Sequence, residues 1–187
     1  MYGQTAVPVI VVLVAALVAA ATDIWKFKVY NALTLPLLVS GLLYHAFRAE
    51  LADSLLGVLF GFAALIVFYI IGGMGAGDVK LMAAVGAWLG MPLTFYVFIA
   101  SSLAAGVYSI GLVVWTGQVG ETAVNLQILW LRLASVGRYL GSDDKVESEV
   151  RRSDRRKRII PFAAMVAIGL VATLIWIGNT PWIGNTP

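Results

Sequence analysis

The sequence contains no cysteine, and this absence removes several kinds of site at once. Without thiols there are no disulfide bonds, no thiolate zinc sites and no cysteine nucleophile. Histidine is almost absent too: His45 is the single one, and a lone histidine lacks the partners that a metal site needs. We therefore expect a site that uses neither a metal nor a cofactor.

Charged residues are scarce as well. They make up 12% of the 187 residues, against 60% hydrophobic residues, and the mean hydropathy of +0.90 is too high for the surface of a soluble domain. Charge-free runs cover positions 1–22, 29–47, 54–77, 81–120 and 159–187. A membrane-crossing helix needs about 20 apolar residues, so each run can hold one span and the longest can hold two. The runs lack the strict apolar/polar alternation of a transmembrane barrel. The sequence therefore predicts an all-α, polytopic integral membrane protein.

Six crossings are predicted, at residues 6–22, 32–47, 55–71, 78–90, 93–115 and 159–177. The fourth is short, because Met91-Pro92 marks a turn. With strict alternation the amino terminus lies outside and residues 116–158 lie in the cytoplasm. This stretch holds nine of the thirteen Lys and Arg residues, as the positive-inside rule requires. We expect one transmembrane domain over residues 1–187, in the inner or plasma membrane.

The stretch 116–158 has two parts of its own. Between Leu126 and Leu140, apolar residues recur at helical spacing, which predicts an amphipathic helix in the membrane interface. The basic run Arg151–Arg158 comes just before the last span and is typical of a segment that attracts anionic lipid headgroups. No aromatic residue is interleaved with this run, so a nucleic-acid partner is not expected.

Two carboxylates interrupt otherwise apolar regions. Asp23 closes the first predicted span and Asp78 opens the fourth, both at the cytoplasmic side. An acid near the hydrocarbon is costly, which makes it a candidate functional residue by default. The short fourth span would place Asp78 about 10 Å below the cytoplasmic surface, from 1.5 Å per residue and a core of about 30 Å. Gly75 and Gly77 precede Asp78, and such irregular backbone needs a cover of protein or a lining of water. The sequence thus predicts a wet, glycine-walled pocket that holds a carboxylate.

Two neighbouring carboxylates suit peptide hydrolysis. They share one proton, so the ionised member can activate a water while the protonated member hydrogen-bonds the scissile carbonyl. Two other uses remain open from the residues alone. Intramembrane acids also line the pathways of small proton- or ion-coupled carriers. An acid at a helix N-terminus, as at Asp78, can also serve structure or assembly alone, through capping and the helix dipole.

Secondary candidates lie near the two acids. Lys80 could contact substrate or extend to the cytoplasmic surface. Asn31 could bind near Asp23 or cap the second helix. His45 is expected at the outer interface, and Trp25, Trp88, Trp115 and Trp176 fall near span ends, where aromatic belts occur.

The stretch Gly75-Ala76-Gly77-Asp78-Val79-Lys80-Leu81 resembles the Gly-x-Gly-Asp signature of the type IV prepilin peptidases, which continues with Val-Lys-Leu. The segment from Asp23 to Asn31 is similar to the family's other aspartate segment, with Val29-Tyr30 in place of its Ile-Pro. Ile160-Pro161-Phe162 resembles the block in the family's last span.

This resemblance implies an intramembrane-type aspartic endopeptidase with Asp23 and Asp78 as its catalytic pair. Its substrates would be pilin-like precursors with a short basic leader, cut at the cytoplasmic border of the membrane. The larger members of the family also N-methylate the new terminus with a cysteine-containing domain. This chain has no cysteine and no insertion between its first two spans, so methyl transfer is not expected.

Overall fold

The computed structural model of the chain describes residues 6–26, 29–70, 74–117 and 161–179. Every regular element in these residues is an α-helix. The helices are α1 (Ala6–Lys26), α2 (Asn31–Phe47), α3 (Leu51–Ile70), α4 (Ala76–Thr116) and α7 (Phe162–Asn179). The chain divides into two compact units, one made of residues 1–106 with 161–187 and the other of residues 107–160. Of the second unit, the described residues are those at the end of α4.

The prediction of an all-α membrane protein is confirmed. Three of the described helices, α1, α3 and α4, are long and apolar enough to cross a membrane, while α2 and α7 are shorter apolar helices. The predicted fourth and fifth spans fall within the single element α4, which runs through both. The number of crossings and the outward amino terminus stay predictions. Of the predicted cytoplasmic stretch 116–158, the residues from 118 onward, with the basic run and the amphipathic helix, lie outside the described residues.

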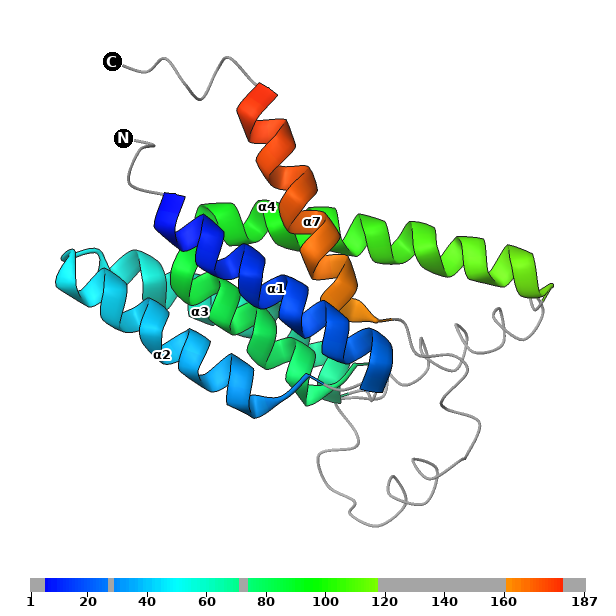
Figure 1. Ribbon diagram of the computed structural model, residues 1–187, viewed down its shortest axis with the longest axis horizontal. Coiled ribbons are helices and arrows are strands. Elements are labelled where there is room, and N and C mark those ends of the chain that lie inside the picture. The colour runs from blue at the N-terminus through cyan, green and yellow to red at the C-terminus, as the bar shows by residue number, and fades with distance from the viewer. Residues whose placement is uncertain (1–5, 27–28, 71–73, 118–160, 180–187) are drawn as a thin grey trace, which may run out of the picture. The chain divides into compact units, whose positions relative to one another are not determined.

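The first part of α4 is the central element of the first unit. All residues from 81 to 90 are buried, on every face of the helix. Figure 1 shows this part of α4 running between α1 and α2, with α3 behind it. Its side chains, among them Met82 and Val85, form the middle of the main apolar cluster together with Val12 of α1 and Leu65 of α3. A helix that is apolar all round suits this position, because it has no polar face to keep in water.

Small residues let α3 approach this central helix closely. Gly57 and Gly61, one helical turn apart, are among the four buried residues of α3. A Cβ on Gly57 would overlap the backbone of Gly86, and one on Gly61 would overlap the backbone of Met82. Between apolar helices in lipid, association comes from this kind of tight contact, since lipid tails are as apolar as the helices. The Gly57–Gly86 contact therefore fixes the spacing of α3 and α4.

The backbone of α4 is broken at Gly90. Its φ of 70° and ψ of 176° are non-helical, and a positive φ is a conformation that glycine adopts easily. The break leaves backbone groups without partners inside the helix. Met91 donates its amide to Asp53 Oδ1 at 3.4 Å, and Pro92 has no amide to satisfy. The break lies directly before the predicted Met91-Pro92 turn.

Side chains from α2 and α3 lie against the backbone carbonyl groups just before the break. Ser54 donates to the carbonyl oxygen of Ala87 at 2.6 Å, and Nε2 of His45 lies 3.0 Å from the carbonyl oxygen of Trp88. Trp88 in turn donates its indole N–H to the carbonyl oxygen of Leu37 at 2.7 Å. Both His45 and Trp88 are buried. Both residues lie near helix ends, as expected, but their side chains are covered by the bundle and bind backbone carbonyl groups. Their place at the membrane interface stays a prediction.

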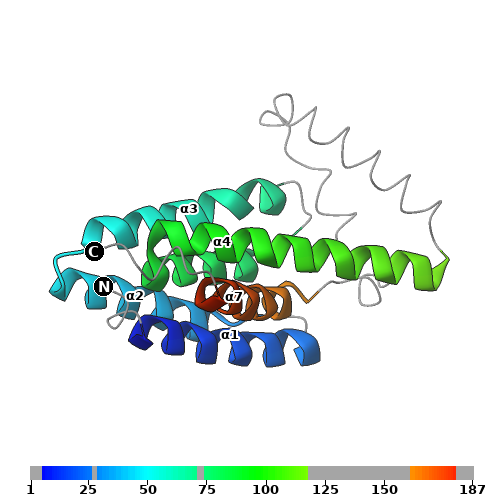
Figure 2. The ribbon, with the colours of Figure 1, turned by 90° about the horizontal axis from the view of Figure 1, so that it is seen from above.

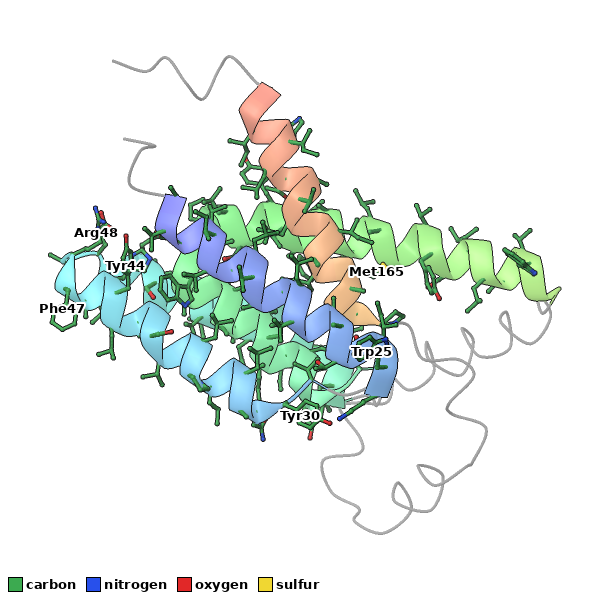
Figure 3. The ribbon with its side chains drawn as sticks, in the orientation of Figure 1. Trp25, Tyr30, Tyr44, Phe47, Arg48 and Met165 are labelled. Atoms are coloured by element: carbon green, nitrogen blue, oxygen red, sulfur yellow. The ribbon has the colours of Figure 1, made fainter. Side chains whose placement is uncertain are left out.

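The outer faces of the first unit are apolar, as a lipid-facing surface must be. Exposed large side chains of α3, for example, include Leu55, Leu59, Phe62 and Phe68. Figure 3 shows Trp25 and Tyr30 at one end of the helices, and Tyr44, Phe47 and Arg48 at the other. Trp25 is 81% exposed and Phe47 is 88% exposed. Aromatic and basic side chains in two such groups are typical of the two membrane interfaces.

The α3–α4 contact leads to a stability prediction. Gly57→Ala inserts a methyl group against the backbone of Gly86, and overpacking of this kind costs about 1–3 kcal/mol. Gly106→Ala is the matched control, because nothing lies within 4 Å of a Cβ at Gly106. We expect thermal unfolding of the detergent-solubilised protein to occur at lower temperature for Gly57→Ala and at an equal or higher one for Gly106→Ala. Equal melting temperatures for the two variants would contradict the close α3–α4 contact.

Candidate active site

Asp23 lies in the last turn of α1 and is only 5% exposed. The sequence predicted that Asp23 closes the first span; the helix itself continues for three residues past Asp23, to Lys26. Its carboxylate oxygen Oδ2 accepts the backbone N–H of Ala163 at 3.0 Å, a buried hydrogen bond between residues 140 positions apart. The first turn of α7 therefore lies against this aspartate.

Asp78 lies in the first turn of α4, which begins at Ala76. Its amide donates to the carbonyl oxygen of Gly75 at 3.2 Å, and the backbone of Gly75 also hydrogen-bonds its carboxylate. A Cβ on Gly75 would lie 3.3 Å from Oδ2 of Asp78. Both the backbone and the Cα of Gly75 therefore lie close to the carboxylate of Asp78. Asp78 itself is partly exposed.

The structure brings the two predicted aspartates together. The charge of Asp23 acts electrostatically on the carboxyl group of Asp78, although α1 and α4 are separated in sequence by two further helices. Both residues belong to the first unit of the chain. One of the pair is buried and bonded to α7, while the other is partly open.

A small apolar cluster lies beside the pair. It consists of Ala19, Val29, Leu81 and Ala163, all buried. Ala19 is one helical turn before Asp23 on α1, and Leu81 is one turn after Asp78 on α4, so the cluster joins the two aspartate-bearing segments. Such a cover excludes water from one side of the carboxylates and raises the strength of electrostatic interactions there.

Gly77 is the reason that the chain after Asp23 can approach Asp78. A Cβ at this position would lie 2.9 Å from the carbonyl oxygen of Val29 and 3.0 Å from its Cβ. Val29 belongs to the connection between α1 and α2, six positions past Asp23. The glycine predicted as part of the active-site loop therefore has a steric role: it lets the α1–α2 connection lie on the start of α4.

Asn31 and Lys80 bind each other. Nζ of Lys80 donates to Oδ1 of Asn31 at 3.0 Å, in an exposed hydrogen bond between the starts of α2 and α4. The N-cap residue of α2 is Tyr30, and Asn31 is the first residue of the helix. The alternative that Asn31 caps the second helix is therefore wrong, since its side chain is used for Lys80. The two residues predicted as substrate-binding form one pair near Asp78.

Among the described residues, no three His, Asp or Glu side chains gather in a way that could hold a metal ion. The chemistry available here is that of two neighbouring carboxylates at the end of a helical bundle. Such a pair can exchange protons with water and with a bound carbonyl or amine.

The fold and these residues define an integral membrane protein with a carboxylate pair. Residues 10–110 match the model of the type IV leader peptidase family. The match covers more than half of the chain, including both aspartates, and the chain belongs to this family. The resemblance stated from the Gly-x-Gly-Asp stretch is thereby confirmed.

The chain is also similar to curated proteins that are named leader peptidases. Over 100 residues the chain is 39% identical to a prepilin leader peptidase/N-methyltransferase of Aeromonas salmonicida, a match that covers 49% of this chain and 34% of the relative. A protein with the same name from Burkholderia pseudomallei is 36% identical over 118 residues, or 57% of this chain and 38% of the relative. Leader peptidase HopD of Salmonella typhimurium is 42% identical over 91 residues, or 43% of this chain and 59% of the relative. The chain thus spans about a third of the length of the first two relatives. No solved structure matches it.

One contributor to the site was not identified from the sequence. The backbone amide of Ala163 donates to Asp23, and the residue type at position 163 gives no indication of this hydrogen bond. The available signal was Pro161, since proline before an apolar run is typical of a helix start and a helix start has free N–H groups.

The Gly77 contact leads to a second prediction. Gly77→Ala places a methyl group against the backbone of Val29, whereas Gly75→Ala meets the Asp78 carboxylate at 3.3 Å and otherwise little. We expect Gly77→Ala to lower the free energy of unfolding by about 1–3 kcal/mol and Gly75→Ala by clearly less, since overpacking against backbone cannot be relieved by a rotamer change. Thermal unfolding in detergent measures both. A larger loss for Gly75→Ala than for Gly77→Ala would show that the α1–α2 connection does not depend on Gly77.

Proposed function

We propose that the chain is a membrane-embedded aspartic endopeptidase that removes the short basic leader of type IV pilin-like precursors. The observation that carries the proposal is the pairing of Asp23 with Asp78, which lie far apart in sequence but interact electrostatically. Membership of the type IV leader peptidase family supports leader cleavage as the reaction. The names of the relatives, prepilin leader peptidase and leader peptidase, support prepilins as the substrate class.

In the proposed reaction the two carboxylates hold one proton between them. The ionised carboxylate takes a proton from a water molecule, whose oxygen attacks the scissile carbonyl carbon. The protonated carboxylic acid hydrogen-bonds the carbonyl oxygen as negative charge develops there. A proton then passes to the amide nitrogen, the C–N bond breaks, and the products are a free carboxylate and a free amine. The step needs neither a cofactor nor a covalent intermediate.

The proposed location of the reaction is the cytoplasmic face of the membrane. Asp23 lies at the carboxyl end of α1 and Asp78 at the amino end of α4, the two ends that the predicted topology puts on the cytoplasmic side. Gly75 and Gly77 would let an extended substrate backbone approach the acids, because neither presents a side chain. We propose the peptidase reaction alone, without methyl transfer, because the chain has no cysteine and only a short connection between α1 and α2.

The test of the catalytic pair is cleavage of a leader-bearing pilin precursor by the purified protein in detergent or liposomes. Asp23→Asn and Asp78→Asn keep the side-chain shape but remove the proton exchange, so each should lower kcat by at least a factor of about 1,000, equal to about 4 kcal/mol of barrier. Glu50→Gln is the control: Glu50 is exposed and pairs with His45 and Arg48 at the opposite end of the bundle. It should cleave at the wild-type rate.

The outcomes separate the candidate functions. Cleavage that persists in either Asn variant would exclude the catalytic pair. A wild-type protein that leaves precursors intact but carries a proton or ion flux in proteoliposomes would instead be a small coupled carrier. If both Asn variants complement a deletion strain, the protein is an assembly scaffold.

A further prediction concerns Asn31 and Lys80, which we propose as a substrate-contacting pair. Because they are bonded to each other, Asn31→Ala and Lys80→Ala should each raise KM about threefold with little change in kcat, and the double variant should raise it no further. Cleavage kinetics with a precursor peptide measure this. Multiplicative effects, or a KM that stays at the wild-type value, would show that the pair does not act as one substrate contact.

A further inference from the structure

The start of α7 lacks a cap of its own. The carbonyl oxygen of Pro161 accepts the amides of Ala164 at 3.1 Å and Met165 at 3.3 Å, so Pro161 occupies the N-cap position of the helix. Serine, threonine, asparagine or aspartate at this position would offer a side-chain oxygen to the first free N–H groups. Proline offers none, and the amide of Ala163 must find its acceptor elsewhere.

Asp23 of α1 supplies the acceptor that α7 lacks. Its Oδ2 lies 3.0 Å from the amide nitrogen of Ala163. Ala163 is fully buried and Asp23 nearly so, which leaves little room for water to take the place of the carboxylate. A carboxylate is also favourable at this end of a helix, where the macrodipole is positive.

The packing of α1 against α7 brings the amino-terminal end of α7 next to Asp23. The buried residues of α1 are mostly alanines, at positions 15, 16, 19 and 20, followed by Asp23. The facing part of α7 buries Ala163 and Ala167 around Val166. Figure 2 shows the two helices side by side. Small side chains permit this short distance between helices, and Asp23 is the polar end of an otherwise apolar contact.

We propose that the amino terminus of α7 positions the Asp23 carboxylate. The amide of Ala163 holds Oδ2, which fixes the rotamer of the side chain and leaves Oδ1 as the oxygen that serves the reaction with Asp78. In its catalytic part this inference rests on the proposed function, whereas the capping part does not. Ala163 is thus a positioning residue that acts through its backbone, from a helix outside the region matched by the family model.

The capping part is tested by thermal unfolding of substituted full-length protein in detergent. Asp23→Asn keeps an oxygen acceptor for the Ala163 amide, whereas Asp23→Ala removes it. Both substitutions remove the repulsion between Asp23 and Asp78, so the comparison between them isolates the cap. We expect Asp23→Asn to melt at or above the wild-type temperature and Asp23→Ala about 2–4 °C below Asp23→Asn, the shift typical of one lost cap in a chain of this size.

A local cap should replace the distant one. Pro161→Ser places a hydroxyl at the N-cap position, within reach of the same Ala163 amide. Added to Asp23→Ala, it should raise the melting temperature to about that of Asp23→Asn. Pro161→Ala is the matched control, because it removes the proline ring without adding an acceptor, and it should restore nothing. Equal melting of Asp23→Ala and Asp23→Asn, or equal rescue by Pro161→Ser and Pro161→Ala, would overturn the capping of α7 by Asp23.

The positioning part is tested by cleavage kinetics with Asp23 intact. In Pro161→Ser the new hydroxyl competes with Asp23 for the Ala163 amide and releases the carboxylate from its fixed rotamer. We expect kcat to fall about tenfold with KM unchanged, because misplacement of a reacting group costs rate rather than binding. Pro161→Ala should keep a kcat close to that of the wild type.

Equal kcat in Pro161→Ser and Pro161→Ala would overturn the positioning role of α7. A wild-type protein that cleaves no precursor would contradict the proposed function instead. The melting comparisons would in that case still decide whether α7 is held by Asp23, so the two failures are distinguishable.

Discussion

The structure depends on one constraint: backbone N–H and C=O groups at helix ends inside an apolar bundle need partners other than water. Two places in the described residues meet it with side chains from neighbouring helices. At the break in α4, Ser54 donates to the carbonyl oxygen of Ala87, and Nε2 of His45 lies 3.0 Å from the carbonyl oxygen of Trp88. At the start of α7, Asp23 binds the amide of Ala163. These buried polar side chains therefore lie where a helix start or break needs a partner.

The second constraint is steric, and it determines how close the helices can come. Gly57 and Gly86 allow α3 to touch the buried part of α4, and Gly77 allows the α1–α2 connection to lie on the start of α4. With a side chain at Gly77, the segment that follows Asp23 would be displaced from the segment that contains Asp78. Gly77 thus acts on the site through the distance between two segments, in addition to any room that it leaves for a substrate.

The sequence predicted much of this and missed specific parts for physical reasons. Charge-free runs located the helices to within a few residues, because hydrocarbon tolerates few charges. The same cost singled out Asp23 and Asp78, which the structure brings together. The hydrogen bonds of His45 and Trp88 to backbone carbonyl groups were not predicted, because composition cannot show which carbonyl groups lie opposite a side chain. The Ala163 amide could not be found from residue types, since a backbone donor is the same at every position except proline.

A comparison of Asp23 with Asp53 shows what distinguishes a functional acid from a structural one. Both accept a backbone N–H at a helix start or break, Asp23 from Ala163 and Asp53 from Met91. Their burial differs, because Asp53 is exposed and Asp23 is 5% exposed, but a buried acid that caps a helix can still serve structure alone. The difference is that Asp23 has a second carboxylate, Asp78, within electrostatic range. Two acids that repel each other are unfavourable for folding, and a chain that needed only a cap could use asparagine at Asp23 without this repulsion. The pairing, rather than the burial of either acid, is thus the feature that stability alone does not explain.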